Sequence, residues 1–134
     1  MKTIRIIAAA ALVAAGAFAP HVALAQWAGI KRTDLARSDL SAPGREVIQV
    51  LVEFAPGVAA PRHSHPGEEI AYVIEGVFLY ELDGRPPVTL KAGESLFIPA
   101  GTPHAVKNVG SGNAVELATY IVEKGRPLLL TLVK

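Results

Sequence analysis

The chain has 134 residues, of which 51% are hydrophobic, contains no cysteine, and carries a formal net charge of +1. Its length fits one domain and leaves no room for a second. The lack of cysteine excludes disulfides, thiolate metal ligands and thiol nucleophiles. No lysine or arginine run forms a basic stripe, so we expect no nucleic-acid partner.

The first 25 residues have the organisation of a secretory signal peptide. Lys2 and Arg5 form a basic start, residues 6–19 are apolar, and Ala23-Leu24-Ala25 is a small-residue cleavage signal. The apolar run is shorter than the roughly 20 residues of a membrane-spanning helix. We expect cleavage after Ala25 and release to the periplasm or the medium with no membrane anchor; an uncleaved anchoring helix is the alternative. Without its leader the chain has 11 basic and 12 acidic residues, a net charge of −1.

Residues 26–45 are predicted to form an N-terminal arm, and residues 46–134 the folded domain. The arm is polar with scattered apolar residues, and a short helical turn is one option for it. From Glu46 onward, short β-rich runs alternate with turn residues, including a tight-hairpin signal at Asp83-Gly84. The predicted strands are 46–54, 69–75, 77–82, 87–90, 95–98, 104–109, 113–122 and 128–133.

This pattern of short strands without a long helix predicts an all-β fold, either a closed barrel or a double sheet. An immunoglobulin-type sandwich is the alternative, but its usual Cys…Trp…Cys core is absent here. A mature domain of this size buries roughly 60–70% of its unfolded surface, which is enough for one core without disulfides.

Four side chains suited to metal binding gather in two short stretches rich in glycine and proline. They are His63, His65, Glu69 and His104. Side chains two apart on a strand point to the same face, so we expect His63 and His65 to aim into one space. Three imidazoles and a carboxylate suit one divalent transition metal, such as Fe, Mn, Ni, Zn or Cu. The remaining coordination positions would be open to water, substrate or dioxygen, which is typical of a reactive site.

Both stretches resemble the two motifs of the cupin family at every position. Residues 57–76 match G-x5-H-x-H-x3-E-x6-G, and residues 93–108 match G-x5-P-x-G-x2-H-x3-N. The resemblance, to small bacterial single-domain cupins, implies a jelly-roll barrel (a double-stranded β-helix) with a metal inside its mouth. It carries over His63, His65, Glu69 and His104 as metal ligands and Asn108 as a structural position.

Several further residues are candidates for the pocket or for supporting the ligands. Arg62 could clamp a substrate carboxylate at the rim, although strand parity points it away from the ligands. Ala71 and Val73 are two and four residues after Glu69, so on a strand they face the same side as Glu69. We therefore expect them to line the pocket and keep it apolar. Phe97 and Asn108 complete the set, although an aromatic side chain such as Phe97 is more often part of a core.

The opposite face of the same strand carries bulky apolar residues. Ile70, Tyr72 and Ile74 would lie outside the barrel, and exposing all three on a monomer would be unfavourable. Cupins often pair through such sheets, so the resemblance implies a homodimer.

Three classes of function follow from the site and the resemblance. The leading hypothesis is a metal-dependent oxygenase of the dioxygenase type that acts on a small organic molecule. The second is a non-redox lyase or isomerase, in which Tyr72, Tyr80 or Glu68 would have to reach the pocket and move a proton. The third is an exported protein that binds a small ligand or a metal without turnover.

The leader hypothesis makes a direct prediction about the mature protein. Mass spectrometry of the exported material should find a chain that starts at Gln26. A chain that still carries residues 1–25 would contradict it.

Overall fold

The computed structural model describes residues 27–131, and in this range the chain forms ten β-strands and no helix. The strands are β1 (Ile30–Asp39), β2 (Arg45–Phe54), β3 (Ala59–Ser64), β4 (Gly67–Glu75), β5 (Val77–Leu82), β6 (Val88–Lys91), β7 (Ser95–Ile98), β8 (His104–Asn108), β9 (Ala114–Glu123) and β10 (Leu130–Thr131). Within the described range, no helix has the length and hydropathy needed to cross a bilayer. The leader expected at residues 1–25 lies outside the described residues.

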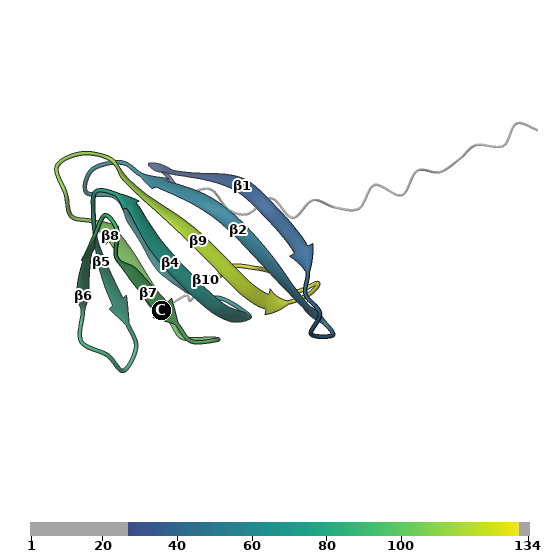
Figure 1. Cartoon of the computed structure of the whole chain (residues 1–134). Coiled ribbons are helices and arrows are strands. Elements are labelled where there is room, and N and C mark those ends of the chain that lie inside the picture. The colour runs from purple at the N-terminus through teal and green to yellow at the C-terminus, as the bar shows by residue number, and fades with distance from the viewer. Residues whose placement is uncertain (1–26, 132–134) are drawn as a thin grey trace, which may run out of the picture.

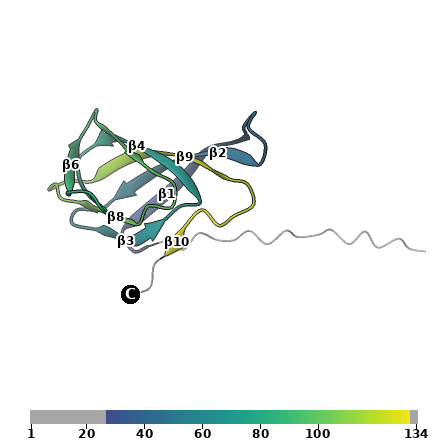
Figure 2. The same ribbon diagram turned by 90° about the horizontal axis from the view of Figure 1, so that it is seen from below.

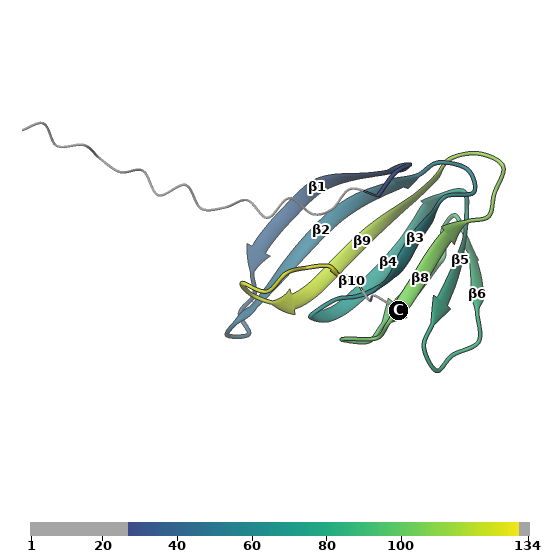
Figure 3. The same ribbon diagram turned by 180° about the vertical axis from the view of Figure 1, so that it is seen from behind.

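The strands make two five-stranded antiparallel sheets that face each other (Figures 1 and 2). The first sheet has the order β1-β2-β9-β4-β7, and the second has the order β10-β3-β8-β5-β6. Figure 3, seen from behind, shows β3, β8, β5 and β6 of the second sheet. The expected all-β jelly-roll barrel is therefore confirmed.

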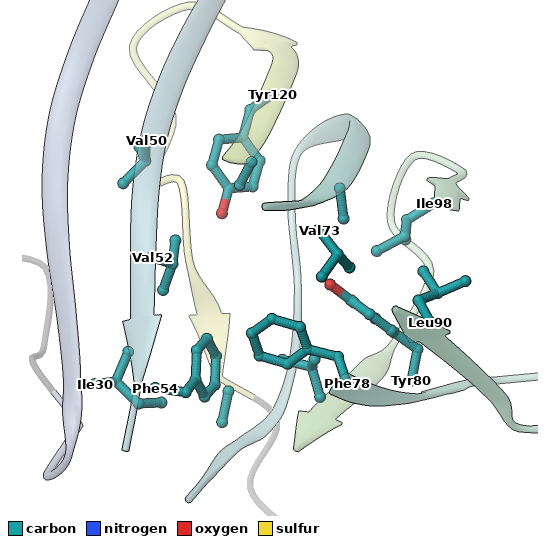
Figure 4. Packing of buried hydrophobic residues seen from close by; sticks show 14 of the residues in the cluster. Ile30, Val50, Val52, Phe54, Val73, Phe78, Tyr80, Leu90, Ile98 and Tyr120 are labelled. Atoms are coloured by element: carbon teal, nitrogen blue, oxygen red, sulfur yellow. The ribbon is translucent and has the colours of Figure 1, made fainter. Parts of the chain in front are cut away.

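The core lies between the sheets and is built by strands whose side chains alternate in burial. On β2, for example, Val50, Val52 and Phe54 are buried, while the residues between them are partly exposed. Figure 4 shows Phe54 beside Phe78 of the facing sheet, and their ring centroids are 5.1 Å apart. This alternation is the period-two pattern of a strand with one face in a core.

The segment predicted as an arm contains β1, an edge strand that the sequence analysis did not predict. It pairs antiparallel with β2, from Ile30 opposite Phe54 to Asp39 opposite Glu46. Only Ile30 is buried, so the strand lacks the apolar alternation on which strand prediction depends. Backbone pairing and ion pairs hold it instead, as Arg37 and Glu46 approach to 2.7 Å.

Strand β3 contains a bulge immediately before the first metal-ligand candidate. Ala60 is opposite Val106 and His63 is opposite His104, so β3 has one residue more than β8 between these two pairs. Without that extra residue, Arg62 would share the inward face with Ala60. The bulge turns His63 inward instead, and Pro61, which cannot donate a ladder hydrogen bond, lies within it.

Gly67 allows two neighbouring strands to approach closely. It begins β4, opposite Val122 of β9. A Cβ atom at this position would lie 2.1 Å from the carbonyl oxygen of Ile121, so only glycine permits the approach of the two strands.

The two faces of β4 are divided as expected. Ala71 and Val73 are fully buried, whereas Ile70, Tyr72 and Ile74 are 40–45% exposed. Phe97 of β7, opposite Ile70, is 52% exposed. We call Ile70, Tyr72, Ile74 and Phe97 the outer apolar patch.

Candidate metal centre

The four ligand candidates converge between the two sheets. His63 on β3 and His104 on β8 are directly opposite each other in the second sheet, and their ring centroids are 4.3 Å apart. Glu69 comes from β4 of the first sheet, and His65 lies in the connection between β3 and β4. All four side chains are buried, with at most 5% of each residue exposed.

Each imidazole is oriented by a hydrogen bond from Nδ1 to a backbone carbonyl. His63 donates to Pro61 at 2.6 Å, His65 to Leu128 at 2.7 Å, and His104 to Thr102 at 2.9 Å. A carbonyl oxygen can only accept, so Nδ1 carries the proton in each ring. Nε2 is then left with a lone pair when the ring is neutral, which is the arrangement of a metal-binding histidine.

The free donor atoms lie close enough for one ion to meet them all. The ligand nitrogens of the three histidines are within 4.8 Å of one another. Glu69 Oε2 lies 3.0 Å from His65 Nε2 and 3.4 Å from His104 Nε2. His65 Nε2 and Glu69 Oε2 are buried without a well-formed hydrogen bond, and such atoms are unfavourable unless something satisfies them. These residues fit a divalent transition metal.

The protonation states of two donors, His63 and Glu69, also suit a cation. Burial, reinforced by the neighbouring His104, lowers the pKa of His63 to about 3, so its ring is neutral at neutral pH. Burial would raise the pKa of Glu69, but His104 and His65 lower it further than burial raises it, so the group stays a carboxylate. Metal ligands must be deprotonated in this way.

A small pocket adjoins these donors. Its volume is about 10 Å³, which is room for about one water molecule or ion. Its lining comes from both sheets and consists of Trp27, Ile30, Arg32, Val52, Phe54, Ala60, His63, Glu69, Tyr80, His104, Val106, Glu116 and Tyr120.

Tyr80 and Glu116 form a buried polar pair in this pocket. The Tyr80 hydroxyl donates a hydrogen bond to Glu116 Oε2, and both residues are at most 4% exposed. Burial, with a contribution from the Glu69 charge, raises the pKa of Glu116 to about 7. Burial, with a contribution from Glu116, raises the pKa of Tyr80, so the phenol keeps its proton.

Of the proton-moving candidates from the sequence, the structure brings only Tyr80 to the pocket. Tyr72 lies in the outer apolar patch, and Glu68 lies 3.6 Å from Arg45 in a partly exposed ion pair. Sequence reasoning missed Glu116, although it alternates with Ala118 and Tyr120 on one face of β9. The opposite face carries Val115, Leu117 and Ile121, so hydrophobicity alone does not say which face is inside.

Arg32 and Tyr120 complete the polar part of the pocket. Arg32 Nη2 donates to the Tyr120 hydroxyl at 3.3 Å, and its guanidinium carbon lies 5.8 Å from the centre of that ring. The Tyr120 ring in turn packs against His65, with centroids 4.7 Å apart. Figure 4 shows the hydroxyls of Tyr120 and Tyr80 directed into the barrel interior.

The remaining candidates lie outside the pocket lining. Arg62 forms an ion pair with Asp83, and Phe97 is on the outer face. Ala71 and Val73 were expected to line the pocket, but they are buried in the core and are not among its lining residues. Val73 lies opposite the lining residue Glu116 on β9. Asn108 is fully buried and donates to the carbonyls of Phe54, Ala55 and Gly112.

Similarity to known proteins was found at the levels of sequence and structure. Dimethylsulfoniopropionate lyase DddQ of Ruegeria pomeroyi is 37% identical over 57 residues, which is 42% of this chain and 28% of the lyase. The structure of an oxalate oxidase superposes with a TM-score of 0.63 at 28% identity, covering 78% of this chain and 55% of that one. A cupin superfamily protein of Desulfitobacterium hafniense shares the fold, with a TM-score of 0.60, 22% identity and coverage of 74% and 83%.

The chain spans less than half the length of the curated relatives that it matches, between 28% and 42% of each. The family model of the cupin domain matches residues 50–129, which include all four ligand candidates and Glu116. The two facing sheets and the buried histidine cluster agree with this match. The chain therefore belongs to the cupin family.

Proposed function

We propose that the protein is a metal-dependent enzyme that transfers protons on a small organic molecule, as a lyase or isomerase. The observation that carries this proposal is the Tyr80–Glu116 pair, which lines the same pocket as His63, Glu69 and His104. A lyase among the relatives, DddQ, supports the same class of reaction. A site that only held a metal would not need a second buried carboxyl group, because burying one without function is unfavourable.

Under this proposal, one group of residues binds the metal and another transfers protons. His63, His65, Glu69 and His104 would hold the divalent metal, which when bound supplies a Lewis acid for a substrate oxygen. Glu116 has a pKa of about 7, so it can accept a proton from a substrate carbon and return it at neutral pH. Tyr80 stays protonated and donates to Glu116, which orients the carboxyl group.

A metal-dependent oxygenase of the dioxygenase type is the second candidate. The likeness to oxalate oxidase, at 28% identity over most of this chain, favours it. Val52, Phe54 and Val106 also give the pocket an apolar side, which suits an organic substrate. In this case Glu116 and Tyr80 would position the substrate and would not exchange protons with it.

We also propose that the chain is exported and acts as a homodimer. The leader at residues 1–25 supports export. The outer apolar patch supports pairing with a second copy, because Ile70, Tyr72, Ile74 and Phe97 are 40–52% exposed on one sheet face. Leu117 and Ile121 of the neighbouring strand β9 are only partly buried and extend this apolar face.

Solvent exchange and oxygen uptake separate the two enzyme classes. Metal-loaded protein should catalyse deuterium exchange or turnover in a panel of 2-oxo and β-substituted carboxylates in heavy water under nitrogen, followed by NMR. Glu116→Gln should lower the rate by roughly 10²–10⁴-fold, because general acid–base groups typically contribute that much. Metal content, measured by elemental analysis, should not change.

Glu81→Gln is the matched control, because Glu81 is an exposed carboxylate next to Tyr80 and should leave the rate unchanged. Oxygen uptake that matches substrate loss, with no exchange under nitrogen, would contradict the proposal and favour the oxygenase. If the protein binds a substrate but shows neither exchange or turnover under nitrogen nor oxygen uptake in air, a non-catalytic binding function would be favoured.

The raised pKa of Glu116 predicts how the stability of the metal-free protein changes with pH. The folded state holds a proton that the unfolded chain releases between about pH 4.5 and 7, so this contribution is complete below pH 4.5 and is lost as pH rises through 7. Relative to Glu116→Gln, the wild type should lose roughly 2 kcal/mol of unfolding free energy between pH 5.5 and pH 8. Urea titrations in the presence of a chelator measure this difference, and parallel curves for the two proteins would refute it.

The outer apolar patch predicts the oligomeric state. Sedimentation velocity at micromolar concentration should give a dimer, and Tyr72→Asp should shift it to monomer because a charge would be buried in the interface. Thr89→Asp, on an exposed position of β6, is the control and should remain a dimer. A wild-type monomer would rule out this surface as a stable interface.

A further inference from the structure

Arg32 places a positive charge in the wall of the pocket. It comes from β1, opposite Val52 of β2, which is opposite Glu116 of β9. Its guanidinium contacts the Tyr120 hydroxyl and ring, and Arg32 is one of the lining residues. An arginine on an edge strand could instead point to solvent, as Lys31 does: its side chain is 73% exposed and forms an ion pair with Glu53.

The guanidinium has unused hydrogen-bonding capacity. Of its five N–H donors, one is directed to the Tyr120 hydroxyl. Its Nε is buried and has no hydrogen-bond partner in the structure. Among residues 27–131, no carboxylate lies within ion-pair distance of Arg32, unlike Arg37, Arg45, Arg62 and Arg126. A buried donor of this kind is normally satisfied, so it is available to a ligand that enters the pocket.

The charge balance of the pocket points to an anion. With a divalent ion at the four donors, Arg32 adds a third positive charge. Glu69 and Glu116, the carboxyl groups of the pocket lining, supply at most two negative charges between them. The loaded pocket is therefore net positive in either state of Glu116, and a negatively charged ligand would relieve the repulsion between the arginine and the ion.

The geometry around Arg32 sets the type of this anion. Tyr120 links Arg32 to the ligand candidate His65, because its hydroxyl accepts a hydrogen bond from Arg32 and its ring packs 4.7 Å from the imidazole. A planar guanidinium fork matches a carboxylate, which is also planar, through two parallel hydrogen bonds.

We propose that Arg32 binds the carboxylate of a small substrate whose other oxygen reaches the His63–His65–Glu69–His104 centre. The substrate class is then a short hydroxy- or oxo-carboxylate. This inference names the substrate of the site under the proposed function and rests on it. Arg62, the clamp expected from the sequence, is occupied by Asp83, so the anion-binding role passes to Arg32.

Calorimetric titration with a matched pair of ligands tests the inference without requiring turnover. The full mature protein is loaded with zinc, which has no redox chemistry, and is titrated with lactate and with its neutral analogue lactamide. Wild-type protein should bind lactate at least 10-fold more tightly than lactamide. Arg32→Gln should weaken lactate binding roughly 10–100-fold, as expected for charged hydrogen bonds, and should leave lactamide binding unchanged.

Lys31→Gln is the matched control, because it removes the same charge from the next position on the same strand. Its lactate affinity should stay within about two-fold of wild type, since rim charges that make no contact contribute little. Arg32→Lys keeps the charge but loses the fork, so its affinity should lie between wild type and Arg32→Gln. The affinity of Arg32→Lys and the melting temperature of each variant show whether weaker binding comes from a lost contact or from unfolding of the protein.

Three results would overturn the inference. One is equal loss of lactate affinity in Lys31→Gln and Arg32→Gln, which would mean a general charge effect. Another is unchanged affinity in a folded Arg32→Gln. The third is tighter binding of inorganic phosphate than of lactate, which would overturn the carboxylate class. Arginine-dependent lactate binding without proton exchange would refute the acid–base function alone, whereas exchange with unchanged binding in Arg32→Gln would refute the role of Arg32 alone.

Discussion

The three hydrogen bonds from imidazole Nδ1 atoms to backbone carbonyls are the constraint on which the site depends. They fix the position of the proton and the rotation of each ring, so three lone pairs meet in one small space. Two of the carbonyls, of Pro61 and Thr102, lie two residues before the histidine that they orient. The third, of Leu128, is 63 residues away from His65. The C-terminal segment therefore helps to build the centre although it contributes no ligand.

Both sheets are needed to complete the pocket, and each supplies a different kind of group. The second sheet supplies His63, His104 and Tyr80, whereas the first supplies Glu69 and the carboxyl group of Glu116. The Tyr80–Glu116 hydrogen bond joins them across the interior. The proposed acid–base pair is thus also a contact between the two layers of the barrel, so its geometry is held by the packing of the whole fold.

The sequence predicted which ligand candidates come together, because their spacing and chemistry are local properties. His63, His65 and Glu69 lie within seven residues, and the one other histidine of residues 26–134 is His104. Arg32 and Glu116 could not be predicted in the same way. Arg32 lies on a strand with almost no buried side chains, and Glu116 lies on a strand whose outward face is at least as apolar as its inward face. Only the register across β1, β2 and β9 brings the two residues together.

The bulge in β3 has a consequence for how the metal site is encoded. Arg62 and His63 are alternatives for one inward position, and the single extra residue between Ala60 and His63 selects the histidine. The identity of the ligand thus depends on chain length as well as on residue type. Loss of one residue at Pro61 or Arg62 would leave every histidine in the sequence. It would nevertheless shift the register of β3 by one residue, so that side chains that face the interior would face outward. An insertion or deletion of a single codon could in this way remove the metal centre of a barrel without substituting any of its ligands.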